Sequence, residues 1–278
     1  MLTPTNLEGN CDNEAGRTAK TDNLLALGLV SAQTVEAAAT RPKVGVILLG
    51  CLVGFLAGEI LASALSAIAA DLAHFPGGFK ALSTSTVPPW WSNALGLIGL
   101  WCGFASAIYF ARVRGRLNAL ASQRKIRPSD AVFILIGVGC QFVIDVLYYP
   151  FHFKKLNAPV THLFGAAHGA TFVLLVIMTT VLAPIFEEWF FRGVIFRSLD
   201  EGLVGVSPRA ATATAVVASA VLFALAHGEP LQFAGLALFG VVLALIIHRT
   251  RRLVPSVIAH VSFNAVAMVG LIVQRSGH

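Results

Sequence analysis

Charged residues are scarce in this sequence. Only 12% of its 278 residues are Asp, Glu, Lys or Arg, whereas a soluble domain usually carries about a quarter. Hydrophobic residues make up 56% of the chain, and the mean hydropathy is +0.76. This composition excludes an ordinary soluble domain and predicts an all-α, polytopic membrane helical bundle.

Signals for several other protein classes are also missing. The sequence has few cysteines and no CxxC pair, and three of the four cysteines lie in apolar runs. We therefore expect small core residues rather than disulfides or a cysteine metal site at Cys11, Cys51, Cys102 and Cys140. The only apolar run near the N-terminus, LLALGLV, is short and follows acidic residues, so it does not fit a signal peptide.

Seven apolar runs are long enough to cross a membrane, at about 20 residues for each crossing. The predicted spans lie near 44–70, 92–111, 131–150, 171–191, 210–228, 233–248 and 253–273. Residues 1–42 are polar, and their composition predicts a disordered cytoplasmic tail. The sequence thus predicts a tail at 1–42 and a transmembrane bundle of about seven helices at 43–278.

The Lys and Arg residues gather in alternate loops. With the N-terminus inside, the inner segments hold sixteen of them and the outer segments four. This bias predicts a multi-pass protein of the cell membrane, with its N-terminus in the cytoplasm and its C-terminus outside. Orientation also accounts for the net charge of +6, so we expect membrane lipid, and not nucleic acid, as a partner.

A few polar residues interrupt the apolar runs, and most of them fall in the C-terminal half. An ionisable group inside a bilayer costs about 2.5–3.5 kcal/mol on insertion scales, so each of these residues needs a role. They are Glu59, Asp145, Glu187, Glu188, Arg192, His227 and His260, with Asn264 as a polar neighbour.

The segment EEWFFR contains two of these glutamates and the arginine. On a helix, Glu188 and Arg192 are four residues apart and share a face, in the order that favours an ion pair. Glu187 is turned about 100° away from Glu188. We therefore expect Glu188 to neutralise Arg192 and Glu187 to face a cavity. The alternative is that EEWFFR is only the interfacial end of a helix, where Arg can reach water.

Two further pairs have the same four-residue spacing. Phe223 and His227 share one helix face near the end of the fifth run, and His260 and Asn264 share a face inside the seventh. If these helices converge, Glu187 and His227 can activate a water molecule, while His260 and Asn264 stabilise an oxyanion. The same residue types leave a second reading open, in which Glu187, His227 and His260 ligate zinc.

These motifs resemble a known family. EExxxR at Glu187–Arg192, FxxxH at 223–227 and HxxxN at 260–264, in this order on consecutive spans, are similar to the CPBP family of CAAX proteases and bacteriocin-processing, abortive-infection-like membrane proteins. The resemblance covers about residues 175–270. Its eukaryotic members are type II CAAX prenyl endopeptidases. Signatures of other intramembrane proteases, namely HExxH, GxGD and a GxSx serine site paired with a histidine, are absent from the sequence.

The resemblance implies an intramembrane endopeptidase whose site opens toward the cytoplasm. It assigns water activation to Glu187 and His227, and the oxyanion to His260 and Asn264, with Glu188, Arg192 and Phe223 in support. Family members are described as metalloproteases, so zinc remains a candidate cofactor. The implied substrate is a peptide or protein, lipidated in the eukaryotic relatives.

Two alternatives are not enzymes. A carboxylate–histidine–asparagine cluster also suits a proton-coupled transporter, and Glu59 and Asp145 would extend such a relay into the first and third spans. A non-catalytic scaffold or immunity protein is the other. The enzyme reading also requires that Glu187 and His227 lie at one depth. The predicted spans give this only if the fourth helix continues to about Leu199 or the fifth helix starts later.

Overall fold

The computed structural model describes residues 43–114, 125–152, 156 and 158–276 of the chain. The predicted tail at 1–42 lies outside them. The described part of the chain is helical and has no strand. Seven of its helices are long and apolar enough to cross a membrane, so the prediction of an all-α polytopic bundle is confirmed. They span Val44–Leu72, Trp90–Val113, Pro128–Phe151, Gly169–Gly202, Pro208–Ala226, Phe233–Thr250 and Leu253–Arg275.

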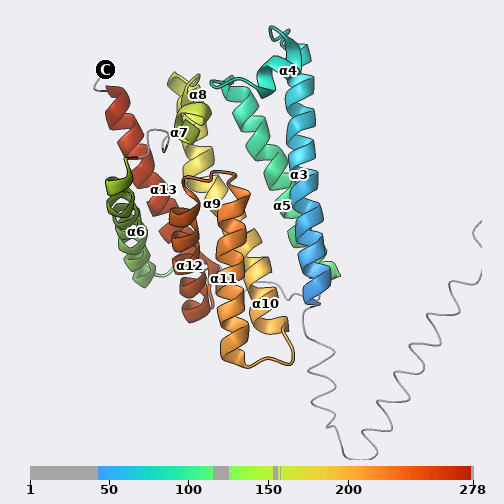
Figure 1. The fold of residues 1–278 in the computed structure, drawn as a ribbon, viewed down its shortest axis with the longest axis vertical. Helices are drawn as coiled ribbons and strands as arrows, with labels where there is room; N and C mark the ends of the chain where they lie inside the picture. Colours follow the sequence, from blue (N-terminus) through green and yellow to red (C-terminus); the bar gives the residue numbers. More distant parts are fainter. Residues whose placement is uncertain (1–42, 115–124, 153–155, 157, 277–278) are drawn as a thin grey trace, which may run out of the picture. The chain divides into compact units, whose positions relative to one another are not determined.

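The first two spans form a tight hairpin. Helix α3 (Val44–Leu72) and helix α5 (Trp90–Val113), joined through the short α4 (Gly78–Ser83), lie side by side in Figure 1. Glycines let the two backbones touch, because a Cβ added at Gly103 would lie 2.3 Å from the carbonyl oxygen of Gly54. Small residues at a helix–helix contact are a common way for membrane helices to pack closely.

The fourth span is longer than the sequence suggested. It runs without a break through α8 (Gly169–Ile177), η4 (Met178–Leu182), α9 (Ala183–Glu187), η5 (Glu188–Phe196) and α10 (Arg197–Gly202). Both η4 and η5 are π-helical, and they flank the turn that carries Glu187. Because the helix continues to Gly202, Glu187 lies near its middle. The π-helical turns are themselves unusual, since such segments are rare and often mark functional sites.

Helices α11 (Pro208–Ala226) and α12 (Phe233–Thr250) form a short hairpin. Ser207 caps the start of α11, where its hydroxyl accepts a hydrogen bond from the backbone N–H of Ala210. The α11–α12 turn lies about halfway along the bundle, close to the level of α9, and well short of the far ends of α3 and α13 (Figure 1). The turn that carries His227 is therefore near the middle of the bundle and not at its edge. The depth problem that the predicted spans posed is thereby removed.

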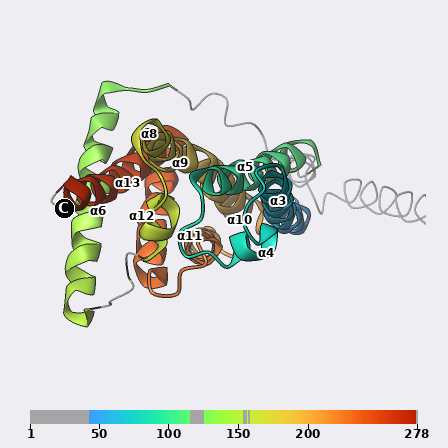
Figure 2. The same cartoon turned by 90° about the horizontal axis from the view of Figure 1, so that it is seen from above.

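Helix α13 (Leu253–Ser276) crosses helix α6 (Val132–Tyr148). Gly137 makes this crossing close, because a Cβ there would lie 2.0 Å from the carbonyl oxygen of Ala259. Viewed along the bundle, α6 lies strongly inclined to the other helices (Figure 2). Short segments flank it: η2 (Pro128–Ala131) before, and η3 (Tyr149–Phe151) and α7 (Ala158–Phe164) after.

The two ends of the bundle differ in charge. The end at which α3, α11 and α13 begin, which we name the basic end, carries nearly all of the Lys and Arg residues that the structure describes outside the core. They are Lys43, Arg112, Arg114, Lys125, Arg127, Arg197, Arg209, Arg249, Arg251 and Arg252, against Lys80 and Arg275 at the opposite end. Ion pairs of Arg252 with Asp130 and of Arg251 with Asp200 join neighbouring helices there.

Candidate active site

Glu188 is the centre of a buried polar network. Its side chain is fully buried, and its Oε1 atom accepts from Arg192 Nη1 at 2.9 Å and from His260 Nδ1 at 3.0 Å. Its Oε2 atom accepts from the hydroxyl of Ser256 at 2.5 Å. The expected pairing of Glu188 with Arg192 is therefore present. Because two helices supply these donors, the carboxylate also ties the fourth span to α13.

Arg192 is buried as completely as its partner. Its Nη2 atom donates to the carbonyl of Gly240 at 3.1 Å, and its guanidinium lies 4.4 Å from the centre of the Phe223 ring. Only its Nε atom is buried without a hydrogen-bond partner. The ion pair and the ring contact offset the cost of burying this cation. EEWFFR is thus not the interfacial end of a helix.

Glu187 lies on the other edge of the same histidine ring. Its Oε2 atom is 3.7 Å from His260 Nε2, and its side chain is 14% exposed, against 3% for His260. Because Nδ1 donates to Glu188, Nε2 is an acceptor in the neutral ring. Attraction between Nε2 and the Glu187 carboxylate therefore requires a proton on one of them, or a bridging water, since 3.7 Å is too long for a direct hydrogen bond.

His227 is an exposed residue at the end of α11. Its Nδ1 atom lies 2.8 Å from the carbonyl oxygen of Phe223, which orients the ring and leaves Nε2 for another partner. The Phe223 ring is 4.6 Å from the His227 ring and 5.5 Å from the His260 ring, centre to centre. Phe223 thus contacts both histidines, and the described contact of Glu187 is with His260, not with His227.

Asn264 binds a backbone carbonyl of the fourth span that has no donor within its own helix. Its Nδ2 atom donates to the carbonyl of Thr179 at 3.0 Å. In the π-helical register of η4, that carbonyl would pair with the N–H of Pro184, which proline lacks. Asn264 therefore supplies the missing donor and links α13 to the turn before Glu187. The second hydrogen of its amide remains available for another acceptor.

His227 and Asn264 share one cavity of about 300 Å³. Its other polar wall residues are Gln141, Asp145, Tyr148, Thr179, Thr180 and Gln232. Thr180 is buried, and its hydroxyl has no hydrogen-bond partner. The residues that line the cavity all belong to the half of the bundle away from the basic end. The predicted cytoplasmic N-terminus puts the basic end in the cytoplasm, whereas the predicted cytoplasmic opening puts the cavity end there. These two predictions therefore point to opposite ends of the bundle.

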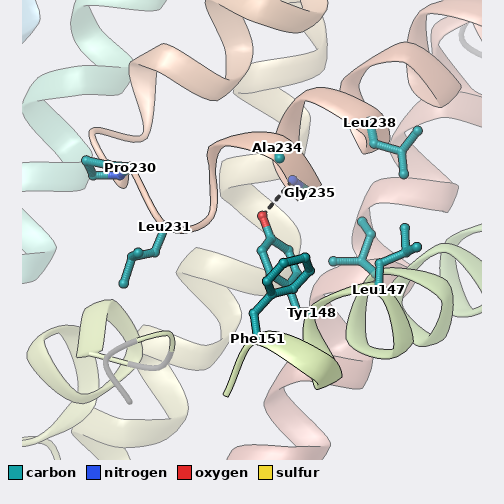
Figure 3. A pocket seen from close by; sticks show the side chains of 9 residues that line it. Leu147, Tyr148, Phe151, Pro230, Leu231, Ala234, Gly235 and Leu238 are labelled. Atoms are coloured by element: carbon teal, nitrogen blue, oxygen red, sulfur yellow. Dashed lines mark hydrogen bonds between the residues drawn. The ribbon is translucent and has the colours of Figure 1, made fainter. Parts of the chain in front are cut away.

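An apolar groove of about 470 Å³ adjoins this cavity. The hydroxyl of Tyr148 accepts a hydrogen bond from the N–H of Gly235 at 2.9 Å, which holds the end of α6 against the start of α12 (Figure 3). Ile144, Tyr148 and Gly235 line both spaces. These three residues therefore form the partition between the polar cavity and a surface of leucines and Phe151.

One comparison with known proteins found a match that covers these motifs. Residues 169–266 match the family model described as type II CAAX prenyl endopeptidase Rce1-like. The chain carries an Rce1-like domain. The match includes all three motifs and confirms the family resemblance, and it implies a protease that acts on a peptide or protein. No curated protein and no solved structure matches the chain.

The Rce1-like domain does not present a zinc site at the expected residues. Nδ1 of His260 faces Glu188, its Nε2 faces Glu187, and Nδ1 of His227 faces a carbonyl. Within the residues that the structure describes, no three His, Cys, Asp or Glu side chains are grouped so that they could hold a metal ion. The partners of the two Nδ1 atoms leave Nε2 of each histidine free, as in zinc-binding histidines, but Glu187, His227 and His260 are not grouped around one point in the described structure, and we derive no step through a metal.

The carboxylates of the first and third spans do not join the site. Glu59 is exposed on α3, on a helix that precedes the Rce1-like domain. Asp145 is also exposed; it borders the cavity and accepts a hydrogen bond from Gln141 at 2.9 Å. The expectation that both carboxylates are buried and extend a polar relay through the bundle is therefore wrong for Glu59. For Asp145 it holds only in that this residue borders the cavity.

Sequence reasoning missed four contributors to the Rce1-like site. Ser256 binds Glu188, Thr180 brings a free hydroxyl to the cavity, and the carbonyls of Gly240 and Thr179 accept from Arg192 and Asn264. A signal for Ser256 exists, because Ser256, His260 and Asn264 recur every four residues on one face of α13. The two carbonyl partners cannot be recognised from the sequence, because every residue has a backbone carbonyl.

Proposed function

We propose that this protein is an intramembrane endopeptidase in which Glu187 and His260 activate water. The observation that carries the proposal is the pair of carboxylates on the two nitrogens of one imidazole: Glu188 on Nδ1 and Glu187 facing Nε2. A structural salt bridge needs only Glu188 and Arg192. A second, partly exposed carboxylate on the far edge of an oriented histidine is what general acid–base chemistry needs.

The reaction follows from this geometry. Glu187 removes a proton from a water molecule, whose oxygen attacks the carbonyl carbon of the substrate peptide bond. The C–O bond forms, and the carbonyl π electrons move to the oxygen. When the tetrahedral intermediate collapses, the C–N bond breaks and the protonated Glu187 gives its proton to the leaving nitrogen. Glu188 accepts a hydrogen bond from Nδ1 of His260 and holds the ring in place, so that Nε2 can accept a hydrogen bond from the same water and orient it beside Glu187.

His227 and Asn264 are proposed to bind the substrate. Both line the cavity, to which the fourth span contributes Thr179 and Thr180, and each keeps a polar group for which the described structure shows no partner: Nε2 of His227 and one amide hydrogen of Asn264. Such groups suit the carbonyl oxygen of a peptide and the oxyanion formed from it. Compared with the assignment from the sequence, His260 moves from the oxyanion to the base, and His227 moves the other way.

The substrate class has two candidates. The family description points to a prenylated CAAX tail, and the bacteriocin-processing relatives point to an unlipidated peptide. We propose testing both forms as quenched fluorescent peptides with the purified protein in detergent, where both faces of the bundle are accessible. The apolar groove beside Tyr148 and the lipid of the surrounding membrane can both accommodate the apolar chain of a lipidated substrate.

The decisive variant is Glu187→Gln, with Glu59→Gln as its matched control. Loss of a general base typically lowers the rate by about 100- to 10,000-fold, so we expect a loss in this range for Glu187→Gln. Glu59 is exposed and makes no described contact with the site, so its variant should cleave at the normal rate. Cleavage by folded Glu187→Gln at the normal rate would refute the mechanism.

A further inference from the structure

We infer that helix α3 binds a second copy of this chain, side by side in the membrane. The contact surface is an exposed row of side chains along α3, which we name the α3 stripe. It consists of Leu49, Leu52, Leu56, Glu59 and Ser63. The inference goes beyond the proposed peptidase function and does not rest on it, because α3 precedes the Rce1-like domain.

The spacing within the α3 stripe is the first observation. Its members are three, four, three and four residues apart, which is the spacing that keeps side chains on the seam between two paired helices. Membrane helices mostly pack at the small left-handed crossing angle that this spacing suits. The three leucines of the stripe are 50–62% exposed. The stripe therefore has the pattern of a helix-packing seam, but none of its members is buried by a helix of its own chain.

The position of α3 leaves this seam accessible. Gly54 and Gly58 lie on another face of the helix and pack against α5. Helix α3 also lies at an edge of the bundle, on the side away from α6 (Figure 2). A neighbouring molecule in the same membrane can therefore reach the α3 stripe without any displacement of the bundle.

Glu59 is the second observation. It lies near the middle of the 29-residue helix α3, and ionisable side chains at such a depth almost always face protein or water. Glu59 is nevertheless exposed on the surface of the bundle, and in the described part of the chain its carboxyl has no hydrogen-bond partner. The same holds for the hydroxyl of Ser63, one turn later. Two unpaired polar groups within an apolar seam indicate that another helix covers them.

The chemistry of these two groups points to a second copy as that helix. In contact with lipid, a carboxyl group costs much less free energy as the neutral acid than as the anion. The neutral acid donates one hydrogen bond and accepts others, and so does a hydroxyl, so each group can pair with its own kind. A two-fold axis along the membrane normal brings the same residues of two copies together at the same depth. A second copy thus supplies the matching polar groups by symmetry.

Glu59 then sets the register of the dimer. A single polar residue in an apolar helix seam specifies which residues meet, because any other register leaves the polar group unpaired. The leucines of the α3 stripe supply van der Waals contact, and Glu59 and Ser63 supply the hydrogen bonds. No member of the stripe belongs to the buried network around Glu188.

Cross-linking in liposomes tests which face of α3 is covered. All four native cysteines of the full chain are replaced by alanine, and one cysteine is then introduced, by Leu56→Cys or by Ala57→Cys. The two positions are adjacent and both exposed, but they are turned about 100° apart on the helix. A disulfide requires Cβ atoms that are close together, so under oxidation we expect covalent dimers of Leu56→Cys and about tenfold fewer of Ala57→Cys.

Energy transfer between two dye-labelled pools of the protein, diluted stepwise with lipid, measures the strength of association. Glu59→Leu removes the hydrogen bonds between the copies, and we expect its association constant to fall about tenfold. Glu59→Gln keeps a donor and an acceptor and should associate as the unchanged protein does. Ala57→Leu, which adds a leucine outside the α3 stripe, is the matched control and should also leave association unchanged.

Three results would overturn the inference: no energy transfer at any density of the unchanged protein, association that Glu59→Leu does not weaken, or equal cross-linking of Leu56→Cys and Ala57→Cys. Cross-linking of Leu56→Cys in native membranes to a different protein, with none between copies, would assign the α3 stripe to another partner and would overturn it as well. The cleavage assay keeps the two proposals apart. Loss of the dimer leaves the comparison of Glu187→Gln with the unchanged protein intact, and failure of that comparison leaves the dimer.

Discussion

The α3–α5 hairpin and the Rce1-like domain hold their helices together in different ways. In the hairpin, glycines bring two backbones into contact, and the ionisable Glu59 remains on the exposed surface. In the Rce1-like domain, a buried carboxylate joins an arginine, a histidine and a serine from two helices. Van der Waals packing of complementary helix surfaces is enough to associate helices in a membrane. Burying a charged side chain in a membrane is costly, so a buried charge indicates a functional site.

Aromatic rings connect the two regions. Phe104 of α5 stacks on Phe190 at 4.2 Å, and Trp101 stacks on Phe186 at 5.0 Å, the residue before Glu187. The hairpin therefore supports the helix that carries the glutamates without adding a polar group to the site. The comparison predicts that changes in the hairpin lower stability alone, whereas changes in the buried network lower both stability and cleavage.

The largest effect is expected for Arg192→Met, which leaves the Glu188 charge buried and unpaired. Breaking a buried ion pair typically costs about 3–5 kcal/mol, so we expect a loss of this size in the free energy of unfolding. Denaturation in mixed detergent micelles measures it. Arg209→Met, at an exposed position, is the matched control. If both variants lose the same stability, the buried pair does not stabilise the fold.

Ser256→Ala removes one donor from the same carboxylate. A hydrogen bond to a charged group contributes about 1.5–3 kcal/mol, and we expect a loss of stability in this range. Because Glu188 also orients His260, the cleavage rate of the folded variant should fall as well. Ser262→Ala is the control on the same helix, since the hydroxyl of Ser262 binds only the carbonyl of Ile258. Equal effects of the two variants would contradict the role of Ser256 in the network.

Gly103→Ala tests the hairpin. The added Cβ would lie 2.3 Å from the carbonyl oxygen of Gly54, and overpacking of this kind costs about 1–3 kcal/mol. The rate of cleavage per folded molecule should not change. Gly96→Ala is the control, because nothing lies within 4 Å of a Cβ at that position. A slower reaction in folded Gly103→Ala would show that the hairpin also shapes the site.

The smallest effect is expected from removal of metal ions. Since the donor atoms of Glu187, His227 and His260 are not grouped around one point in the described structure, a chelator should leave the cleavage rate unchanged. The measurement compares purified protein before and after dialysis against a chelator, with zinc added back as the control. Loss of activity that zinc restores would require a different arrangement of these three side chains.

The sequence by itself determined the features that depend on neighbours along the chain. Hydropathy gave the class of fold and the seven spans, because about 20 apolar residues are needed for each crossing. Four-residue spacing gave the Glu188–Arg192 pair, because residues four apart share a helix face. The three motifs gave the family.

The tertiary structure decided everything that depends on how deep each helix sits and how it is rotated. Hydropathy does not report either quantity, since lipid-facing and buried apolar residues look alike in the sequence. Only the assembled bundle shows that His260 faces both glutamates, that Asn264 binds the Thr179 carbonyl freed by Pro184, and that the cavity lies away from the basic end. Contacts between helices are set by packing of whole surfaces, and no local pattern in one helix records them.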